Sequence, residues 1–445
     1  MTECIRQDSK TQLAFPYYTK KKLTADFDGG QITSDAGLLL LREFDERVGL
    51  TEQVAQCIEE KRTEYLIGHP LLEIVRQRAY QIAAGYEDAN DANLLRGDPT
   101  FKLIADRSTG PEDDLSSQPT ITRLENSATG ADIGRLSDCL LKNYIKTRKV
   151  APKEIILDID PTEDPTHGQQ ELGFFNGYYD KHMYFPLLIF DGKGHLLAAR
   201  LRPGNVHAAE GGLRLLARVV RKLREAFPGV RILVRLDSSF AKPEIYRYCE
   251  KEGLEYLIGM KPNAILKSES EKLLHRAVAS YEKSHRKQRT FTSFRYKAGT
   301  WHKQRRIVAK AEVSAEGVNR RFVVTNLKGR SGELYDLYAA RGEAENRIKE
   351  LKLGMYADRL SCHSFTANRF RLYLHAFAYE LIVLFREALT GTELAGAQVD
   401  TLRVRLFKVG ARVVETARRV WLHLSSGWPF RELFKRVCGA VAAFG

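Results

Sequence analysis

The sequence predicts an α/β fold in which two buried strands end in acidic residues. The apolar runs 155–160 and 230–237 end in Asp160 and Asp237, as expected where strands leave a buried sheet. A strongly helical stretch, 338–352, follows both runs. Strand-like runs and helical segments alternate between these positions, which is typical of an α/β domain.

The first third of the chain, 1–148, is predicted to be a helical domain. A capping sequence at 33–35 precedes a run of leucines, a second apolar run covers 71–82, and a third helix is expected over 131–147. The polar, proline-containing stretch 110–119 is the best linker candidate.

The spacing of the apolar residues changes in the central part of the chain. Two apolar runs, 184–190 and 195–201, flank the sequence DGKG at 191–194, which is typical of a β-hairpin. Helices are then expected over 208–227 and 243–252, and a strand follows each helix. This order of strands and helices is that of the ribonuclease H fold. It places acidic residues on strand one, on strand four and on the helix that follows the last strand.

The 108 positions from Asp237 to Glu345 exceed what that order of elements requires. The excess, 261–330, is predicted to be a β-rich insertion in a catalytic domain that spans 149–392. The remaining residues, 393–445, are predicted to form a small basic C-terminal region. Strand-like runs are expected at 290–296, 305–313 and 321–327 in the insertion, and at 402–408 and 413–424 in the C-terminal region.

Three carboxylates from two strands and one helix, those of Asp160, Asp237 and Glu345, form an oxygen-rich set suited to Mg²⁺ or Mn²⁺. In a basic protein, such a set indicates metal-dependent phosphoryl transfer on nucleic acid. Asp158 points to the same side of the strand as Asp160 and competes with it as a ligand. Asp160 is nearer to the strand end and precedes Pro161, so it is the predicted ligand. Asp158 then either supports Asp160 or serves as a ligand itself.

Four side chains of the stretch 338–352 share one narrow face if the helix is regular, at about 100° per residue. They are Tyr338, Arg341, Glu345 and Lys352. The alternative is a solvated face on which Glu345 pairs with Arg341 and Lys349, each pair contributing only about 0.3–0.5 kcal/mol. The two strand-end aspartates, in the expected order, favour a functional face.

The insertion combines cations with aromatic residues. Trp301 follows Gly299 and Thr300 at an expected hairpin tip, a placement that suits stacking on an unpaired base beside phosphate contacts. The alternative is that the aromatic residues pack in the core. The basic residues around Trp301 are Arg286, Lys287, Arg289, Arg295, Lys297, His302, Lys303, Arg305 and Arg306.

The net charge of +14 favours a polyanionic partner and, among polyanions, nucleic acid. The six cysteines are scattered without a CxxC pair, so neither a zinc site nor a disulfide framework is expected, as suits a reducing cytoplasm. The first 22 residues lack the apolar core of a signal peptide. The apolar segment 372–389 contains charged residues, so no membrane association is expected.

These residues resemble those of a known family. The spacing of Tyr338, Arg341, Glu345 and Lys352 matches the Y-R-E-K signature of DDE transposases of bacterial insertion sequences. The wider pattern resembles the insertion sequence 1380 family within that group. The matching segments are 117–126, 157–162, 201–207, 235–240 and 358–363.

The resemblance implies a ribonuclease H-like catalytic domain with a β-insertion, which acts as a homodimer on paired transposon ends. It implies that Asp160, Asp237 and Glu345 are the catalytic metal ligands. Two Mg²⁺ ions per site are expected, and Mn²⁺ can substitute for them. The implied location is the bacterial cytoplasm, in association with the nucleoid.

The resemblance also implies contacts with double-stranded DNA, both terminal inverted repeats and target. Tyr338, Arg341 and Lys352 are expected to contact phosphates near the cut, with Lys349 beside them. Trp301 corresponds to an insertion tryptophan that holds a flipped base while a hairpin forms. The residues His302, Lys303, Arg305 and Arg306 complete the predicted DNA contacts.

The helical domain, 1–148, is expected to recognise the terminal repeats because it has capped helices, basic side chains and no metal site. Two other functions stay open at this point. One is a nuclease of the same fold that does not join strands. The other is a non-catalytic DNA-binding protein descended from a transposase.

Overall fold

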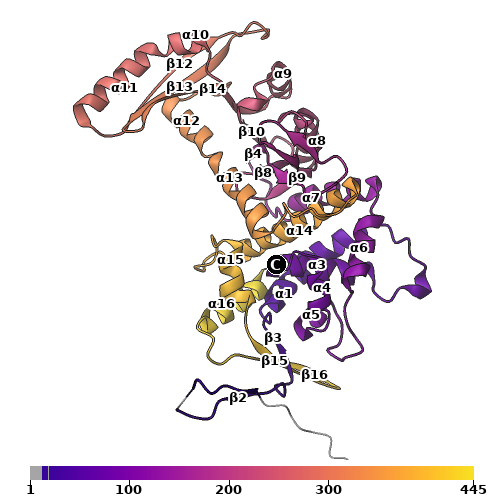
Figure 1. Ribbon diagram of the computed structural model, residues 1–445. Coiled ribbons are helices and arrows are strands. Elements are labelled where there is room, and N and C mark those ends of the chain that lie inside the picture. The colour runs from indigo at the N-terminus through magenta and orange to yellow at the C-terminus, as the bar shows by residue number, and fades with distance from the viewer. Residues whose placement is uncertain (1–12, 19, 445) are drawn as a thin grey trace, which may run out of the picture.

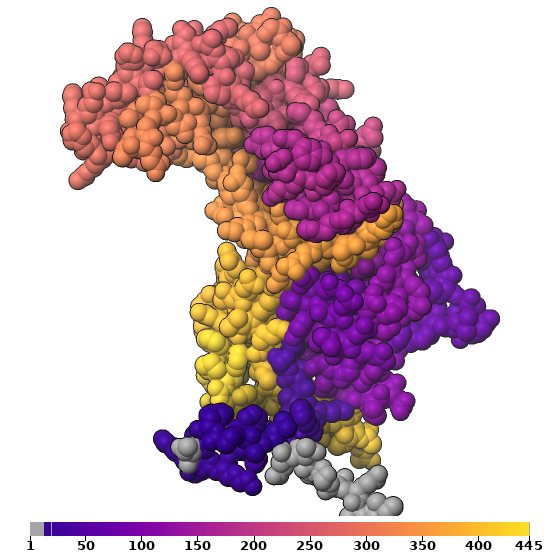
Figure 2. All heavy atoms as spheres, viewed as in Figure 1, coloured from indigo at the N-terminus to yellow at the C-terminus, as the bar shows by residue number. Residues whose placement is uncertain are grey.

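The computed structural model describes residues 13–18 and 20–444, so the first twelve residues of the predicted helical domain lie outside the described part. The described chain is a curved body with a concave side (Figures 1 and 2). Residues 261–330 project at one end of the curve. The N-terminal and C-terminal segments lie side by side at the other end.

An eight-stranded mixed sheet forms the centre of the protein. Its strands lie in the order β12-β13-β14-β11-β10-β4-β8-β9. Five of these strands come from the central part of the chain. Their bounds are β4 Glu154–Pro161, β8 Leu187–Asp191, β9 Leu196–Arg200, β10 Arg231–Leu236 and β11 Glu255–Met260.

The two strands whose apolar runs end in aspartates are direct neighbours. β4 and β10 are parallel and pair in register from Glu154 opposite Arg231 to Ile159 opposite Leu236. On the other side of β4, β8 runs antiparallel to it, and β9 runs antiparallel to β8. Because β4 and β10 end together, the residues that follow them emerge at the same edge of the sheet.

Apolar residues alternate on these strands, so each face of the sheet buries a core. On one face, α8 (Gly212–Ala226) and α9 (Pro243–Lys251) pack through residues such as Leu216 and Ile245. The other face is covered by α14 (Phe365–Ala388), which is buried along most of its length. Among the described residues, no helix is long and apolar enough to cross a membrane.

The N-terminal helices build their core around α14. α3 (Leu71–Ala84) and α7 (Gly130–Lys146) both pack on α14, and α1 (Leu38–Val48) and α2 (Leu50–Gln56) add to the same core. That core continues into the C-terminal segment, where Leu402, Leu406 and Val437 are buried with it.

The C-terminal segment also pairs with the N-terminal part through a small sheet. β3 (Gln31–Thr33) pairs with β15 (Ala411–Thr416), which pairs with β16 (Arg419–Leu424). α16 (Arg431–Ala443) then packs against α1. The predicted strand over 413–424 is therefore a hairpin of two strands.

The predicted strand over 402–408 is wrong. α15 (Val399–Leu402) continues into a π-helical turn, η4 (Arg403–Phe407). The buried residues Leu402, Leu406 and Phe407 have helical spacing. A short apolar run does not by itself distinguish a buried strand from a buried helix.

The insertion is only partly β-structure. Its first third contains two helices, α10 (Ala264–Glu269) and α11 (Glu271–Ser284), which the sequence reasoning missed. Its three strands extend the central sheet, because β14 pairs with the edge of β11 from Leu257 opposite Thr325 onward. This pairing covers an edge that would otherwise be open. The strand bounds are β12 Gln288–Tyr296, β13 Arg305–Ser314 and β14 Gly317–Thr325.

The remaining elements are short or lie beside the carboxylates. They are β1 Leu13–Ala14, β2 Thr24–Ala25, η1 Glu64–Leu66, α4 Asp91–Leu95, α5 Pro99–Ile104, α6 Gln118–Ser127, β5 Asp164–Pro165, β6 Phe174–Asn176, β7 Lys181–Tyr184, η2 Ser238–Phe240, α12 Ser331–Ala339, α13 Gly342–Lys349 and η3 Glu350–Gly354. α12 and α13 run along the concave side of the molecule (Figure 1).

Candidate active site at the strand ends

The two strand-end aspartates lie side by side. Asp160 is the penultimate residue of β4, and Asp237 directly follows β10. Each comes one residue after the last pair of the two strands, Ile159 and Leu236. Neighbouring strands are about 4.8 Å apart, so the two backbones are close at this edge. The Asp237 carboxylate accepts hydrogen bonds from the backbone N–H of Ser239 (2.9 Å) and from its hydroxyl (2.5 Å).

Asp158 has a different environment from Asp160. Its two carboxylate oxygens accept hydrogen bonds from Arg235 Nε (2.7 Å) and Nη2 (2.6 Å), and both side chains are buried. The two residues are paired opposite each other on β4 and β10. Arg235 also donates to the carbonyl of Leu337. This bidentate pair joins two strands to α12. The sequence signal for it is an arginine between apolar residues of β10, Arg235 between Val234 and Leu236.

The predicted continuous helix over 338–352 is wrong. α12 ends at Ala339, α13 begins at Gly342, and the π-helical turn η3 follows from Glu350. Gly342 has low helix propensity, and a π turn adds a residue to the turn, so the regular spacing of 100° per residue does not apply. Tyr338 therefore lies on α12, and Lys352 lies in the π turn.

Arg341 joins two of the three carboxylates. Its Nη1 donates to both oxygens of Asp160, at 2.7 and 2.6 Å, and its Nη2 donates to Glu345 Oε1 at 2.9 Å. Arg341 is largely buried, whereas the Glu345 side chain is 65% exposed. Two carboxylates that are 185 positions apart thus converge on one cation.

The electrostatics show that the three acidic residues share one site. Burial raises the pKa of Asp160 to about 7, and Asp237, Asp158 and Glu345 add to the rise, while Arg341 opposes it. For Arg341, burial acts to lower the pKa, but Asp160, Tyr338 and Glu345 outweigh it, and the pKa is raised. The guanidinium therefore stays charged and neutralises part of the acidic cluster.

Tyr338 lies over the same cluster because a glycine leaves room for it. A Cβ atom at Gly259 of β11 would come within 2.4 Å of the Tyr338 hydroxyl and 3.4 Å of the Asp237 carbonyl carbon. Burial raises the pKa of Tyr338, and Asp237 and Asp160 raise it further, against the effect of Arg341. The hydroxyl is thus held protonated beside the carboxylates.

The two predicted lysines differ in exposure. Lys349 is exposed, and the alternative Glu345–Lys349 ion pair is absent from the described residues. Lys352 is 17% exposed, and its Nζ lies 3.9 Å from Glu163. Asp164, in β5 next to Glu163, is buried. Its pKa is raised by burial and by Asp358, while Lys352 opposes the rise.

The predicted exposure of Trp301 is wrong. The ring is 4% exposed and packs edge-on against Tyr246 and Tyr296. Arg305 lies over the ring and is itself buried in a bidentate ion pair with Glu250. The loop between β12 and β13 therefore folds back onto the sheet and buries the side chains of Trp301 and Arg305.

The other predicted contacts in the insertion are more exposed. His302 and Lys303 have side chains that are 51% and 53% exposed. Arg306 is half-buried and donates to the carbonyls of Leu327 and Gly329. His302 and Lys303 therefore present their ends to solvent, whereas Arg305 is buried.

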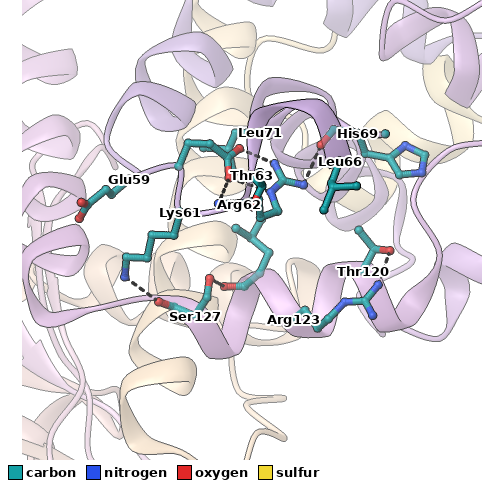
Figure 3. A pocket seen from close by; sticks show the side chains of 13 residues that line it. Glu59, Lys61, Arg62, Thr63, Leu66, His69, Leu71, Thr120, Arg123 and Ser127 are labelled. Atoms are coloured by element: carbon teal, nitrogen blue, oxygen red, sulfur yellow. Dashed lines mark hydrogen bonds and ion pairs between the residues drawn. The ribbon is translucent and has the colours of Figure 1, made fainter.

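A large pocket lies elsewhere, in the N-terminal helical part (Figure 3). Its volume is about 670 Å³, and it is bounded by the loop that follows α2 and by α6. Its basic residues already have partners. Arg62 pairs with Glu60, Lys61 donates to the carbonyl of Ser127, and Arg123 donates to the hydroxyl of Thr120. The pocket is distinct from the carboxylate cluster.

The donor set suits a divalent cation. Within the described residues, no three acidic, histidine or cysteine side chains are already arranged around a metal position. The Arg341 guanidinium, however, lies where the Asp160 and Glu345 oxygens converge, and Asp237 is on the neighbouring strand. Oxygen ligands of this kind are those that Mg²⁺ and Mn²⁺ prefer. Asp160, Asp237 and Glu345 could therefore hold a metal once Arg341 moves aside.

Comparisons with known proteins place the chain in a family. The comparison with curated proteins found no match. A cryo-EM structure of the piggyBac transposase synaptic complex with hairpin DNA is similar, with a TM-score of 0.44 and 12% sequence identity, over 84% of this chain and 80% of that chain. The family model described as transposase DDE domain group 1 matches residues 15–444. Because this match spans nearly the whole sequence, the chain belongs to the transposase DDE domain group 1 family.

Proposed function

We propose that the protein binds the terminal inverted repeats of a bacterial insertion sequence and catalyses Mg²⁺-dependent DNA cleavage and strand transfer. The observation that carries this proposal is the convergence of Asp160 and Glu345 on one cation, with Asp237 on the next strand. Membership in a DDE transposase family supports DNA cleavage and joining as the reaction. The net charge of +14 supports a polyanionic substrate.

Asp160, Asp237 and Glu345 are the proposed catalytic metal ligands. DDE family membership implies divalent-metal dependence in general. Two Mg²⁺ ions, or Mn²⁺ in their place, would activate a water or a 3′-hydroxyl and stabilise the leaving oxygen. Asp158 is proposed to be structural, because Arg235 already occupies both of its oxygens.

Arg341, Tyr338, Lys349 and Lys352 are the proposed phosphate contacts of the active site. Arg341 is bound to Asp160 and Glu345 in the described arrangement, so it has to leave them when the carboxylates take a metal. Its guanidinium is then free to bind a phosphate oxygen bidentately. Tyr338 is held protonated and can donate a hydrogen bond at the same place.

The fold supports the same reading. The five central strands lie in the order β9-β8-β4-β10-β11, with only β8 antiparallel to its neighbours, which is the order proposed for a ribonuclease H-like catalytic unit. We propose that the helical part up to residue 148 recognises the terminal repeats, that two chains act together, and that they work in the bacterial cytoplasm at the nucleoid. His302 and Lys303 remain proposed DNA contacts.

A cleavage and joining assay tests this function. Purified protein is incubated with a linear DNA that carries the sequences flanking its own gene and with a supercoiled target plasmid, in Mg²⁺ or in EDTA. The proposal predicts cuts at the repeat ends and joined products, in Mg²⁺ only. Cuts without joined products would identify a nuclease. Specific binding without cuts would identify a non-catalytic derivative.

A further inference from the structure

A second basic site lies beside β9, away from the carboxylates. A cavity of about 260 Å³ is bounded by α7, the end of β9, the start of α8 and the start of α14, which Figure 1 shows side by side. Of the described residues, four arginines and no acidic residue line it. The arginines are Arg200, Arg214, Arg218 and Arg369.

Three of these arginines have no partner among the residues that the structure describes. Arg218 donates to the Ser137 hydroxyl (2.9 Å) and pairs with Asp138 (2.8 Å). Arg200, Arg214 and Arg369 form neither a hydrogen bond nor an ion pair with any residue in 13–18 or 20–444.

Two of the unpaired charges, Arg200 and Arg369, repel each other. Burial lowers the pKa of Arg369, and Arg200 lowers it further, while Tyr373 opposes the effect. Burial and Arg200 likewise lower the pKa of Arg202, the next arginine along the chain, to about 10. Repulsion between cations at a partly desolvated site costs free energy, and a bound anion offsets that cost.

The backbone leaves space in front of these side chains. Gly130 and Gly134 of α7 line the cavity, and a Cβ atom at either would meet no atom within 4 Å. Gly211, in the left-handed conformation at φ +70°, allows Arg200 to lie close, because a Cβ there would be 2.9 Å from Arg200 Nη1. A compact oxyanion can therefore reach the guanidinium groups.

We propose that this cavity binds a backbone phosphodiester of DNA. Arginine is suited to this ligand because its planar donors match two phosphate oxygens. Arg200 of β9 is opposite Leu187 of β8, and Leu187 is opposite Pro161 of β4, the residue after Asp160. Two strand spacings are roughly 10 Å, which equals about three base-pair steps of 3.4 Å. Both positions lie at the same end of the sheet, so a DNA molecule that crosses this end would pass both sites, with Asp160 and Arg200 pointing to opposite faces of the sheet. The assignment of the ligand to DNA rests on the proposed function.

The test compares arginines inside and outside the cavity. A labelled duplex is titrated with full-length protein at several salt concentrations, using wild type, Arg214→Gln, Arg369→Gln and Arg221→Gln. Arg221 is also on α8 but is 68% exposed, pairs with Glu225 and does not line the cavity. Arg214 is exposed on its helix, so Arg214→Gln keeps the test informative if Arg369→Gln fails to fold.

Each cavity variant is expected to weaken binding roughly tenfold at low salt. It should also reduce the slope of log Kd against log salt concentration by about 0.9, the loss of one phosphate contact. Arg221→Gln should match wild type. Cavity variants that equal wild type in affinity and slope would overturn the proposal, and intact cleavage in the same preparations would show that the proposed function stands.

Titration with inorganic phosphate distinguishes a DNA phosphate from a free phosphate ion as the ligand of the cavity. If phosphate raises the Tm of wild type but not of Arg214→Gln, while duplex binding is the same for both, the cavity is a free-anion site and the DNA assignment is overturned. Competition between phosphate and duplex in wild type, lost in Arg214→Gln, supports the assignment. A wild type that binds no duplex at all overturns both this assignment and the proposed function.

Discussion

Arg341 Nη1 lies 2.6 and 2.7 Å from the two carboxylate oxygens of Asp160. The same side chain reaches Glu345 through Nη2, so one guanidinium spans the two carboxylates that are proposed to hold metal. A divalent cation and this guanidinium therefore compete for the same oxygens. The competition gives Arg341 a role before DNA binds, as the charge that keeps a buried acidic cluster stable.

Arg341→Ala tests that role. The substitution leaves Asp160 buried beside Asp237 and Glu345 without a cation, so the metal-free protein should lose about 1–3 kcal/mol of stability. Mg²⁺ should restore more of the Tm in the variant than it adds to wild type. Thermal unfolding in EDTA and in Mg²⁺ measures both effects. Equal Tm values for variant and wild type in EDTA would contradict the role.

Substitutions of Asp158 and Asp160 are expected to affect different properties, stability for Asp158 and cleavage for Asp160. Asp158→Ala leaves Arg235 buried and unpaired, which should cost about 3–5 kcal/mol of stability. Asp160→Asn removes a negative charge from the cluster, so the variant should stay folded yet lose cleavage. Urea unfolding combined with the cleavage assay separates the two. A stable, inactive Asp158→Ala beside an active Asp160→Asn would reverse the assignment of the ligand.

Trp301→Ala is expected to act through the core. The ring packs on Tyr246 and Tyr296, and its removal should cost about 3–5 kcal/mol. Trp421, which is 51% exposed, offers a matched control, and Trp421→Ala should change stability little. Urea unfolding gives both values. A Trp301→Ala protein as stable as wild type, but unable to form hairpin ends, would contradict the core role and support base stacking.

His375 is expected to make the fold sensitive to acid. It is buried, Nδ1 lies 2.7 Å from the Met355 carbonyl, and burial lowers its pKa to about 3, with Arg371 and Arg78 adding to the effect. The unfolded chain takes up this proton below about pH 6.5, and the folded chain does not. Its contribution to stability is therefore complete above pH 6.5 and is lost as pH falls toward 3, at about 1.4 kcal/mol per pH unit.

His375→Gln keeps a donor for the Met355 carbonyl but removes the titration. Unfolding measured from pH 7 to pH 5 should show a shallower loss of stability in the variant than in wild type. Parallel curves for the two proteins would mean that His375 takes up its proton in the folded state as well.

The sequence predicts the parts of the site that depend on local pattern. Apolar runs locate β4 and β10, and the aspartates at their ends follow from the same runs. The helical composition around Glu345 also locates α13. It does not locate the break at Gly342 or the π turn, because both depend on how the segment fits the sheet.

Long-range packing accounts for the other errors. A glycine before Trp301 suggests an exposed tip, but the ring is buried by Tyr246, which lies on a distant helix. Arg305 pairs with Glu250, 55 positions away, and Asp158 pairs with Arg235, 77 positions away. The arginines of the second basic site come from β9, α8 and α14, and no local pattern connects them.

The central claim is that Asp160, Asp237 and Glu345 hold the catalytic metal. The most direct test compares Glu345→Gln with Glu343→Gln, because Glu343 is an exposed acid on the same helix, two positions earlier. Single-turnover cleavage of repeat-end DNA is measured over a Mg²⁺ titration at matched DNA occupancy. We expect Glu345→Gln to bind the DNA but not to cut it at any Mg²⁺ concentration, and Glu343→Gln to cut like wild type. Cleavage by Glu345→Gln at the wild-type rate and with the wild-type Mg²⁺ dependence would contradict the claim.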